Sequence, residues 1–208
     1  MDAAIGIRVN DGVIVATSRA CTRSITILKP DDDKTRILNE HNILAYTGTS
    51  GDTTQFADYI QGNMQLYSMR EGVDLNSKGI ASYIRHELAT SLRSRSPYQV
   101  NILLAGLDKG DAPFLSNIDY MGTRVDLPYA AHGYAAFYVM SLFDRHYRPD
   151  MTLKDGMKLL KMCKAELDER FPVVFKGFQV KVVDKEGIHS SEPVSYTHLR
   201  AHETRRHL

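Results

Sequence analysis

The chain lacks tryptophan and has only two cysteines, Cys21 and Cys163, among its 208 residues. The absence of tryptophan by itself excludes nothing. The two cysteines lie far apart and show neither metal-ligand spacing nor the density of a disulfide framework. A reducing compartment is therefore the simplest interpretation.

An excess of charge of one sign is also missing, because 26 lysines and arginines stand against 25 aspartates and glutamates, for a net charge of +1. Nucleic acids and anionic membranes attract strongly basic surfaces, so we expect neither as a partner. No apolar run approaches the roughly 20 residues of a membrane span. The N-terminus also lacks the basic stretch and apolar segment of a signal peptide.

The rest of the composition is typical of a globular protein, with 43% hydrophobic and 25% charged residues. The length is sufficient for one large domain with a sizeable core. No internal repeat and no low-complexity linker divides the chain. We therefore predict a single domain over residues 1–194.

Two short apolar runs near the N-terminus, 5–9 and 13–16, flank Asn10-Asp11-Gly12. Asp-Gly between strand-like runs predicts a tight hairpin, because both central positions of such a turn tolerate positive φ. This hairpin would hold the N-terminal residue on a core strand. One class of hydrolases uses its own first residue there as nucleophile and the α-amine as base. Met1-Asp2-Ala3 offers no Thr, Ser or Cys in that place.

The order of the remaining elements predicts the fold class. Short strand-like runs bounded by turn residues occupy 25–28, 34–38, 43–47, 98–107, 114–121, 123–127 and 178–182. Helical periodicity marks about 52–70, a segment from Asn76 or Ser77 up to Pro97, about 134–147, and a segment from Thr152 onward. Because helices come in pairs and strands in runs, we predict an α+β fold, a four-layer αββα sandwich with two antiparallel sheets between helix pairs.

Three local expectations accompany this order. The first 47 residues are expected to form a β-meander. The segment 134–147 is apolar nearly all round, which predicts burial on more than one side. Thr152 with Asp155 resembles a capping box at the start of the fourth helix.

Residues 195–208 differ in character from the rest of the chain. His198 and His202 are spaced i, i+4, which on a helix could hold a metal ion. No apolar face ties the segment to the domain, and it resembles translated sequencing-adaptor sequence. We interpret it as a non-native or disordered tail and exclude it from the fold.

Four segments carry a specific resemblance to a known family: Gly51–Gln61, Arg93–Gly106, Tyr147–Thr152 and Val183–Ile188. In them the chain resembles the β-type subunits of the proteasome core particle, which belong to the N-terminal nucleophile hydrolase superfamily. It is most similar to the non-catalytic subfamily at the fourth position of the β ring. The resemblance spans about residues 2–194 and implies the αββα sandwich.

Catalytic members of that family use an N-terminal threonine activated by an aspartate, a lysine, a serine and a later Asp/Ser pair. The resemblance places Asp2 at the nucleophile, Ser18 at the aspartate, Lys34 at the lysine and His132 at the serine. The later pair falls in 171–176, where neither Asp nor Ser occurs. Because such groups act as a unit, the resemblance implies that these positions are degenerate and that the chain has no catalytic residue.

The residue types support the same conclusion. A carboxylate at Asp2 is a weak nucleophile, and Ser18 cannot hold the charge of a lysine. Lys34 itself is expected to be a solvated lysine at a strand end, beside Asp31-Asp32-Asp33.

Other candidates have plain structural interpretations. His132 could act as a general base, but without a nucleophile in a recognisable motif nearby it is expected to be structural. His86 and His146 are expected in solvent, and the acidic runs 31–33 and 168–169 lack the spaced ligands and turn glycine of a calcium site. Four tyrosines are expected in the core or in a subunit interface: Tyr98, Tyr120, Tyr129 and Tyr134. We predict no cofactor and no metal.

The resemblance implies a structural subunit that supports ring assembly and ATP- and ubiquitin-dependent protein degradation by the whole complex, in the cytoplasm and nucleus. Its partners would be other α- and β-type subunits in a stacked-ring hetero-oligomer, with regulatory particles contacted indirectly. Two alternatives stay open. One is an active N-terminal threonine peptidase with an unrecognised processed N-terminus, and the other is a free-standing scaffold of the same fold.

Overall fold

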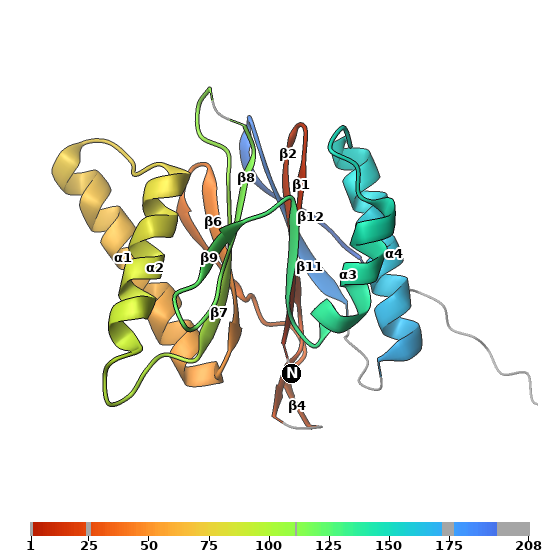
Figure 1. The fold of residues 1–208 in the computed structure, drawn as a ribbon, viewed down its shortest axis with the longest axis horizontal. Coiled ribbons are helices and arrows are strands. Elements are labelled where there is room, and N and C mark those ends of the chain that lie inside the picture. The colour runs from red at the N-terminus through yellow and green to blue at the C-terminus, as the bar shows by residue number, and fades with distance from the viewer. Residues whose placement is uncertain (1, 24–25, 111, 172–176, 195–208) are drawn as a thin grey trace, which may run out of the picture.

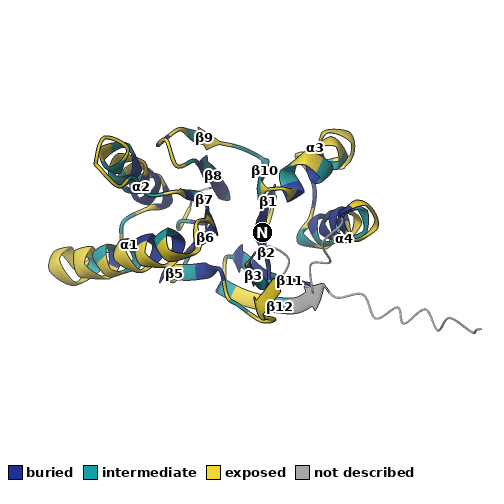
Figure 2. Cartoon of the chain, turned by 90° about the horizontal axis from the view of Figure 1, so that it is seen from below, coloured by how far each residue is buried: buried dark blue, intermediate teal, exposed yellow. Residues whose placement is uncertain are grey.

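The computed structural model describes residues 2–23, 26–110, 112–171 and 177–194. Two five-stranded antiparallel sheets in this part of the chain pack face to face (Figure 1). Helices α1 (Ser50–Glu71) and α2 (Ser77–Ser91) cover one sheet. Helices α3 (Ala135–His146) and α4 (Leu153–Arg170) cover the other, as the view from below shows (Figure 2). The predicted four-layer α+β sandwich is confirmed.

The first sheet has the strand order β10-β1-β2-β11-β12 and the second has the order β5-β6-β7-β8-β9. The first consists of β10 (Tyr129–Gly133), β1 (Ala3–Val9), β2 (Gly12–Ser18), β11 (Phe178–Asp184) and β12 (Gly187–Val194). The second consists of β5 (Thr35–Asn39), β6 (Asn42–Gly48), β7 (Val100–Gly106), β8 (Phe114–Ile118) and β9 (Arg124–Asp126).

Strands β3 (Cys21–Arg23) and β4 (Thr26–Lys29) pair in a separate two-stranded sheet. The first 47 residues therefore contribute to three sheets, and the predicted β-meander is wrong. Alternation of apolar residues identifies a strand but not its neighbour, and β2 pairs on one side with β11, from the far end of the chain. Strands β3, β10 and β12 were not predicted.

The N-terminal hairpin is confirmed, but its glycine has a different purpose from the predicted one. Val9 pairs with Gly12, so Asn10 and Asp11 form the turn and Gly12 is the first residue of β2. A Cβ on Gly12 would lie 2.2 Å from the carbonyl oxygen of Val183. The glycine is therefore required by the close approach of β11 rather than by a positive φ.

Side-chain caps fix the start of two helices where the sequence predicted them. The Asn76 Oδ1 accepts a hydrogen bond from the Gly79 N–H at 2.8 Å at the start of α2. The Thr152 hydroxyl accepts from the Asp155 N–H at 3.3 Å and donates to the Asp155 carboxylate at 2.8 Å, which confirms the capping interaction. Gly72, at φ +68°, ends α1 in the left-handed conformation.

Apolar side chains fill the three spaces between the layers. One cluster lies between α3, α4 and the first sheet, and a second lies between α1, α2 and the second sheet. The third, here called the seam, lies between the sheets and consists of Ala4, Val13, Val15, Ile43, Ala45, Leu103, Ala105, Leu107, Leu115, Ala130 and Val183. Among the described helices, none combines the length and the apolar character needed to cross a membrane.

Helix α3 is less buried than its composition predicted. It contacts α4 on one side and β10 and β1 on another, through Ala135, Val139 and Phe143. Phe137, however, is 81% exposed and Tyr134, just before the helix, is 53% exposed. The prediction fails on this outward side because two neighbours cannot cover apolar residues all round a helix. Residues 195–208, with His198 and His202, lie outside the described residues.

Candidate functional site

The N-terminal end of β1 brings three of the predicted positions together. Ala3 pairs with Gly133 and Ala4 with Thr17, which places Asp2 beside the ends of β2 and β10. Gly133 has φ +75°, and a Cβ there would lie 2.1 Å from the Asp2 carbonyl oxygen. A glycine is thus the residue that lets β10 approach the chain start so closely.

Lys34 is the centre of this site and is only 3% exposed, so the prediction of a solvated lysine is wrong. Its Nζ lies 3.2 Å from the Asp2 carboxylate. It donates to the backbone oxygens of Ser18 and Ala20, each at 2.7 Å, and contacts the Ser18 hydroxyl at 3.3 Å. These groups, Asp2, Ser18, Ala20 and Lys34, are called the polar cluster below. They satisfy the ammonium in the way that a buried charge requires.

The aspartates at positions 31–33 do not draw the Lys34 side chain toward solvent, because each of them forms an ion pair with a different basic residue. Asp31 pairs with Arg19 at 2.8 Å and Asp32 with Lys29 at 3.1 Å. Asp33 pairs with Lys181 at 2.8 Å. This ion pair joins the segment before β5 of the second sheet to β11 of the first sheet. Burial raises the pKa of the Asp33 carboxyl, but hydrogen bonds from Lys181 and Thr35 outweigh it and leave the pKa below its usual value.

Ser18 holds no charge, yet it has a clear place in the cluster. It is fully buried, and its hydroxyl oxygen accepts the Ala3 N–H at 3.1 Å. The charge of Lys34 is balanced by Asp2, the residue that the resemblance placed at the nucleophile. Sequence reasoning missed this pairing, because it judged Asp2 as a nucleophile and Ser18 as a counter-ion, each in isolation.

His132 lies on β10 and reaches across to the second sheet. Its Nε2 lies 3.2 Å from the Ile102 carbonyl oxygen, which can only accept, so Nε2 carries the proton. Burial lowers the pKa of His132, against the smaller opposing effects of the Ile102 carbonyl and Asp119. A neutral imidazole that bridges two sheets fits a structural histidine.

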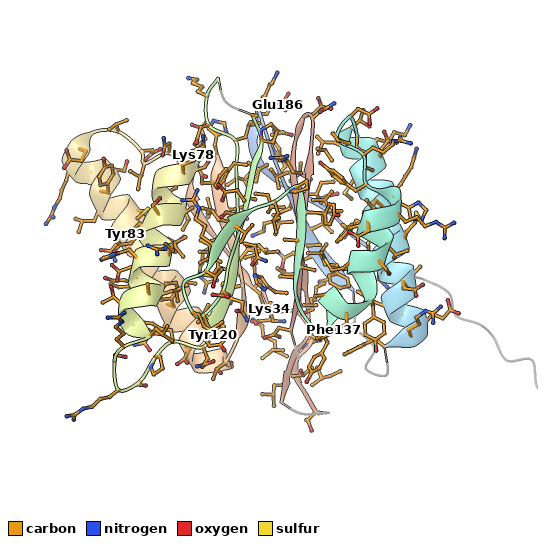
Figure 3. All side chains as sticks on the ribbon, viewed as in Figure 1. Lys34, Lys78, Tyr83, Tyr120, Phe137 and Glu186 are labelled. Atoms are coloured by element: carbon orange, nitrogen blue, oxygen red, sulfur yellow. The ribbon has the colours of Figure 1, made fainter. Side chains whose placement is uncertain are left out.

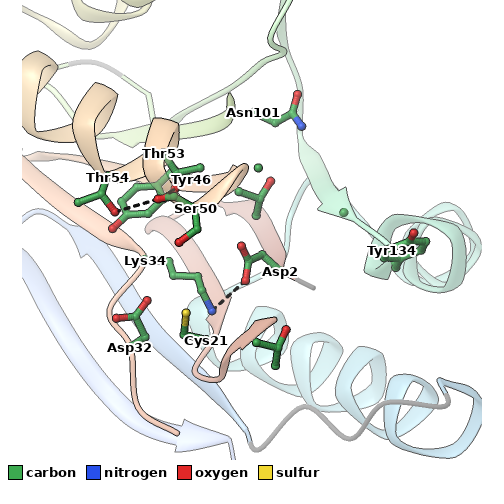
Figure 4. A pocket seen from close by; sticks show the side chains of 14 residues that line it. Asp2, Cys21, Asp32, Lys34, Tyr46, Ser50, Thr53, Thr54, Asn101 and Tyr134 are labelled. Carbon is green, nitrogen blue, oxygen red and sulfur yellow. Dashed lines mark hydrogen bonds and ion pairs between the residues drawn. The ribbon is translucent and has the colours of Figure 1, made fainter. Parts of the chain in front are cut away.

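A cleft of about 320 Å³ opens beside the polar cluster (Figure 4). Its lining includes Asp2, Cys21, Lys34, Thr47, Ser50 and Tyr134. Sequence reasoning did not single out Cys21 or Thr47 for this site. The signal for Thr47 was present, because it follows Ile43 and Ala45 at the period of two that places side chains on the seam side of β6.

The remaining candidates lie away from this cleft or outside the described residues. His86 and His146 are exposed on α2 and at the end of α3. Asp168 forms an ion pair with Lys164 one helical turn away on α4. Of the segment 171–176, only Phe171 is described, and its ring packs against Tyr134 and Tyr138.

The four tyrosines divide between core and surface. Tyr98 packs its ring on Phe56, with centroids 5.1 Å apart, and Tyr129 packs on Phe143 and Tyr147 at the same distance. Tyr120 and Tyr134 are exposed in this chain. Figure 3 shows Tyr120, Lys34 and Phe137 toward the same end of the molecule, opposite Glu186.

A family model described as proteasome subunit matches residues 2–183, which is most of the described fold and all four positions of the candidate site. The chain belongs to the proteasome subunit family. The match begins at Asp2 and ends within β11, so among the described elements it leaves out only β12 and the last residue of β11.

Curated relatives narrow the family to β-type subunits. "Probable proteasome subunit beta type-4" of Meyerozyma guilliermondii is 60% identical over 190 residues, which cover 90% of this chain and 98% of the relative. "Proteasome subunit beta type-4" of Saccharomyces cerevisiae is 56% identical, covering 90% and 96%. "Proteasome subunit beta type-2" of Oryza sativa is 37% identical, covering 95% and 92%. The resemblance to proteasome β subunits is thereby confirmed, with the greater likeness to those named type-4.

Proposed function

We propose that this chain is a non-catalytic, structural β subunit of the proteasome core particle. It supports ring assembly, and through the whole complex it supports ATP- and ubiquitin-dependent protein degradation. The observation that carries the proposal is the 3.2 Å ion pair between Asp2 and Lys34. The residue at the nucleophile position is a carboxylate, and it neutralises the lysine that would otherwise assist an activated threonine.

The partners that we propose are other α- and β-type subunits in a stacked-ring hetero-oligomer, with regulatory particles contacted indirectly. Large exposed apolar side chains support this, since Phe137 and Met69 are each more than 80% exposed in the isolated chain. Exposed apolar surface of this kind is typical of a face that a partner covers. We propose residence in the cytoplasm and the nucleus, and neither nucleic acid nor membrane as a partner.

Covalent labelling of the native particle tests the absence of catalysis. A threonine-directed inhibitor should form adducts with catalytic subunits of the same particle, which serve as the internal positive control. Peptide mapping should find no adduct within residues 1–4 of this chain. An adduct there would overturn the proposal and favour the alternative, an active threonine peptidase with an unrecognised processed N-terminus.

Native mass and N-terminal sequencing complete the test. The chain should co-purify at equal stoichiometry with many different subunits, and a stable monomer as the only native species would contradict the assembly role. Sequencing of the native N-terminus should find no Thr, Ser or Cys at the first position. Asp2→Thr with Met1 removed should stay inactive, because Ser18 and His132 do not rebuild the groups that activate a threonine.

Microscopy tests the proposed compartments. A fluorescent fusion at the C-terminus should give signal in both cytoplasm and nucleus. Exclusion from both would contradict the localisation without affecting the catalytic argument.

A further inference from the structure

A second cavity, of about 320 Å³, lies away from the polar cluster. Its lining comes from β1, the first turn of α2, the connection between β7 and β8, the start of β8, and β9. Figure 3 shows Lys78, one of its lining residues, toward the end of the molecule where Glu186 lies and away from Lys34. A cavity of this volume is at the small end of the range for small-molecule sites.

Arg8 extends into this cavity from the seam side of β1. Ala4 belongs to the seam, and a Cβ on Gly6 would lie 2.8 Å from the side chain of Leu115, which is also in the seam. Because side chains alternate along a strand, Arg8 points to the same side as these two positions. Arg8 is partly buried, and its guanidinium forms no ion pair or hydrogen bond among the described residues. Charges removed from water are normally paired, so this guanidinium is suited to an incoming anionic group.

Asp108 carries a charge of the opposite sign in the same cavity. Its carboxylate accepts the Ser77 N–H at 2.8 Å and the side-chain amide of Asn42 at 3.3 Å. Both donors are uncharged, and within the described part of the chain Asp108 forms no ion pair. A carboxylate has room for about four hydrogen bonds, so Asp108 can still accept from a cation.

The two remaining charged lining residues are already satisfied. Asp126 forms an ion pair with Arg124 at 3.0 Å and accepts the Ser116 hydroxyl at 2.7 Å. Lys78 is exposed on α2, so water can hydrate its ammonium. The described lining therefore presents one partly buried cation and one anion that are not neutralised, and these two groups do not form an ion pair with each other.

This arrangement restricts the class of ligand. A guanidinium binds a carboxylate through two parallel N–H···O bonds, and a carboxylate accepts hydrogen bonds from an ammonium. A simple anion would be repelled by Asp108 and a simple cation by Arg8, whereas a zwitterion would neutralise both. Ala112, Pro113 and Phe114 add an apolar part to the lining.

We propose that this cavity binds free zwitterionic α-amino acids with an apolar side chain. Arg8 holds the α-carboxylate, Asp108 holds the α-ammonium, and the apolar side chain lies against Ala112 and Pro113. Binding is non-covalent. The site is separate from the cleft beside Asp2 and does not depend on whether the chain is catalytic.

Titration of the full chain with L-leucine by isothermal calorimetry tests the ligand class. Saturable binding in the millimolar range or tighter is expected. N-acetyl-L-leucine lacks the ammonium and L-leucine amide lacks the carboxylate, so each should bind at least about tenfold more weakly, as expected for the loss of a hydrogen bond between charged groups. The proposal would be overturned if L-leucine shows no saturable binding at millimolar concentrations, or if either analogue binds as well as L-leucine.

Variants of the two charged residues locate the binding in this cavity. Arg8→Gln and Asp108→Asn should each weaken L-leucine binding at least about tenfold, and Arg8→Lys, which keeps the charge, should weaken it less. Arg93→Gln is the matched control, because Arg93 is exposed and is not part of the cavity lining, and it should leave the affinity unchanged.

The Arg8→Gln variant also separates a loss of binding from a loss of folding. Because the Arg8 guanidinium bonds to no described residue, its replacement breaks no contact and should leave the thermal unfolding midpoint unchanged. Asp108→Asn, in contrast, also alters a hydrogen bond at the start of α2. Equal affinity of Arg8→Gln and the unchanged chain for L-leucine would overturn the proposal.

Discussion

Two regions lie between the same pair of sheets and can be compared directly: the apolar seam and the polar cluster around Lys34. In the seam, Leu103 and Ile43 are fully buried and are held by contacts that have no preferred direction. In the polar cluster, Lys34 is almost equally buried but is held by one carboxylate and by specific oxygens of Ser18 and Ala20.

The difference lies in what each region contributes. Burial of apolar area stabilises the fold by about 25 cal/mol per Å², whatever the detailed geometry. Transfer of the Lys34 ammonium from water is unfavourable, and its partners do little more than offset that transfer. We therefore expect the seam to determine global stability and the polar cluster to determine how the N-terminal residues are positioned.

The largest effect is expected from a cavity in the seam. Leu103→Ala should lower the free energy of unfolding by about 2–5 kcal/mol, since it removes buried apolar atoms and leaves a space. Leu28→Ala is the matched control, because Leu28 on β4 is 63% exposed, and it should change stability by less than about 0.5 kcal/mol. Urea unfolding of both variants measures this difference, and similar losses for the two would contradict the role of the seam.

A smaller and non-additive effect is expected in the polar cluster. Lys34→Met should lower the free energy of unfolding by about 3 kcal/mol, because it leaves Asp2 and two backbone oxygens without their donor. Asp2→Ala should lower it less, since the Asp2 side chain is 21% exposed and partly solvated. Once Lys34 is replaced, the Asp2 carboxylate has lost its ion-pair partner. Replacing Asp2 as well should then lower the free energy of unfolding by less than it does in the unchanged chain.

The double variant Asp2→Ala/Lys34→Met distinguishes the two regions most sharply. Its loss should be smaller than the sum of the single losses by about 1 kcal/mol or more, because the two residues are in direct contact. Leu103→Ala combined with Lys34→Met should be close to additive, because Leu103 belongs to the seam and is not among the polar partners of Lys34. Additivity of the Asp2 and Lys34 losses would show that their ion pair contributes nothing.

The same comparison explains what the sequence could and could not predict. The strands of the seam were recognisable as short apolar runs, 13–16 in β2 and 43–47 in β6. Within them, residues 13, 15, 43 and 45 lie at the period of a strand and meet where the sheets face each other. Helix starts followed from Asn76 and Thr152, whose side chains cap the chain a few residues away. The strand runs 13–16 and 43–47 and the two helix starts depend on local sequence and were predicted, whereas the seam that the strands form was not.

The polar cluster depends on contacts between distant segments. Lys34 follows three aspartates, which locally indicates a solvated position, but those aspartates pair with Arg19, Lys29 and Lys181. The Lys34 environment exists only once β1, β2 and the segment before β5 converge. The reason for Gly12 was missed in the same way, because the atom that excludes a side chain belongs to β11.

The smallest effect is expected at His132, which joins the seam side of β10 to the Ile102 carbonyl oxygen. Burial holds its pKa below the value of about 6.5 for an unfolded chain, so the unfolded state binds the proton more readily. The stability that the neutral imidazole provides is therefore complete above about pH 6.5. It is lost as the pH falls from there through the lower pKa of the folded state.

His132→Gln keeps a donor for Ile102 but does not titrate, so at pH 7.5 it should change stability by no more than about 1 kcal/mol. Between pH 6.5 and 5, the unchanged chain should lose more stability than the variant, as measured by urea unfolding at a series of pH values. His86→Gln, on the exposed face of α2, is the control and should leave the pH dependence of the unchanged chain intact. If stability depends on pH in the His132→Gln variant as it does in the unchanged chain, the imidazole does not act as a buried neutral group. The polar end of the space between the sheets would then be more hydrated than its hydrogen bonds indicate.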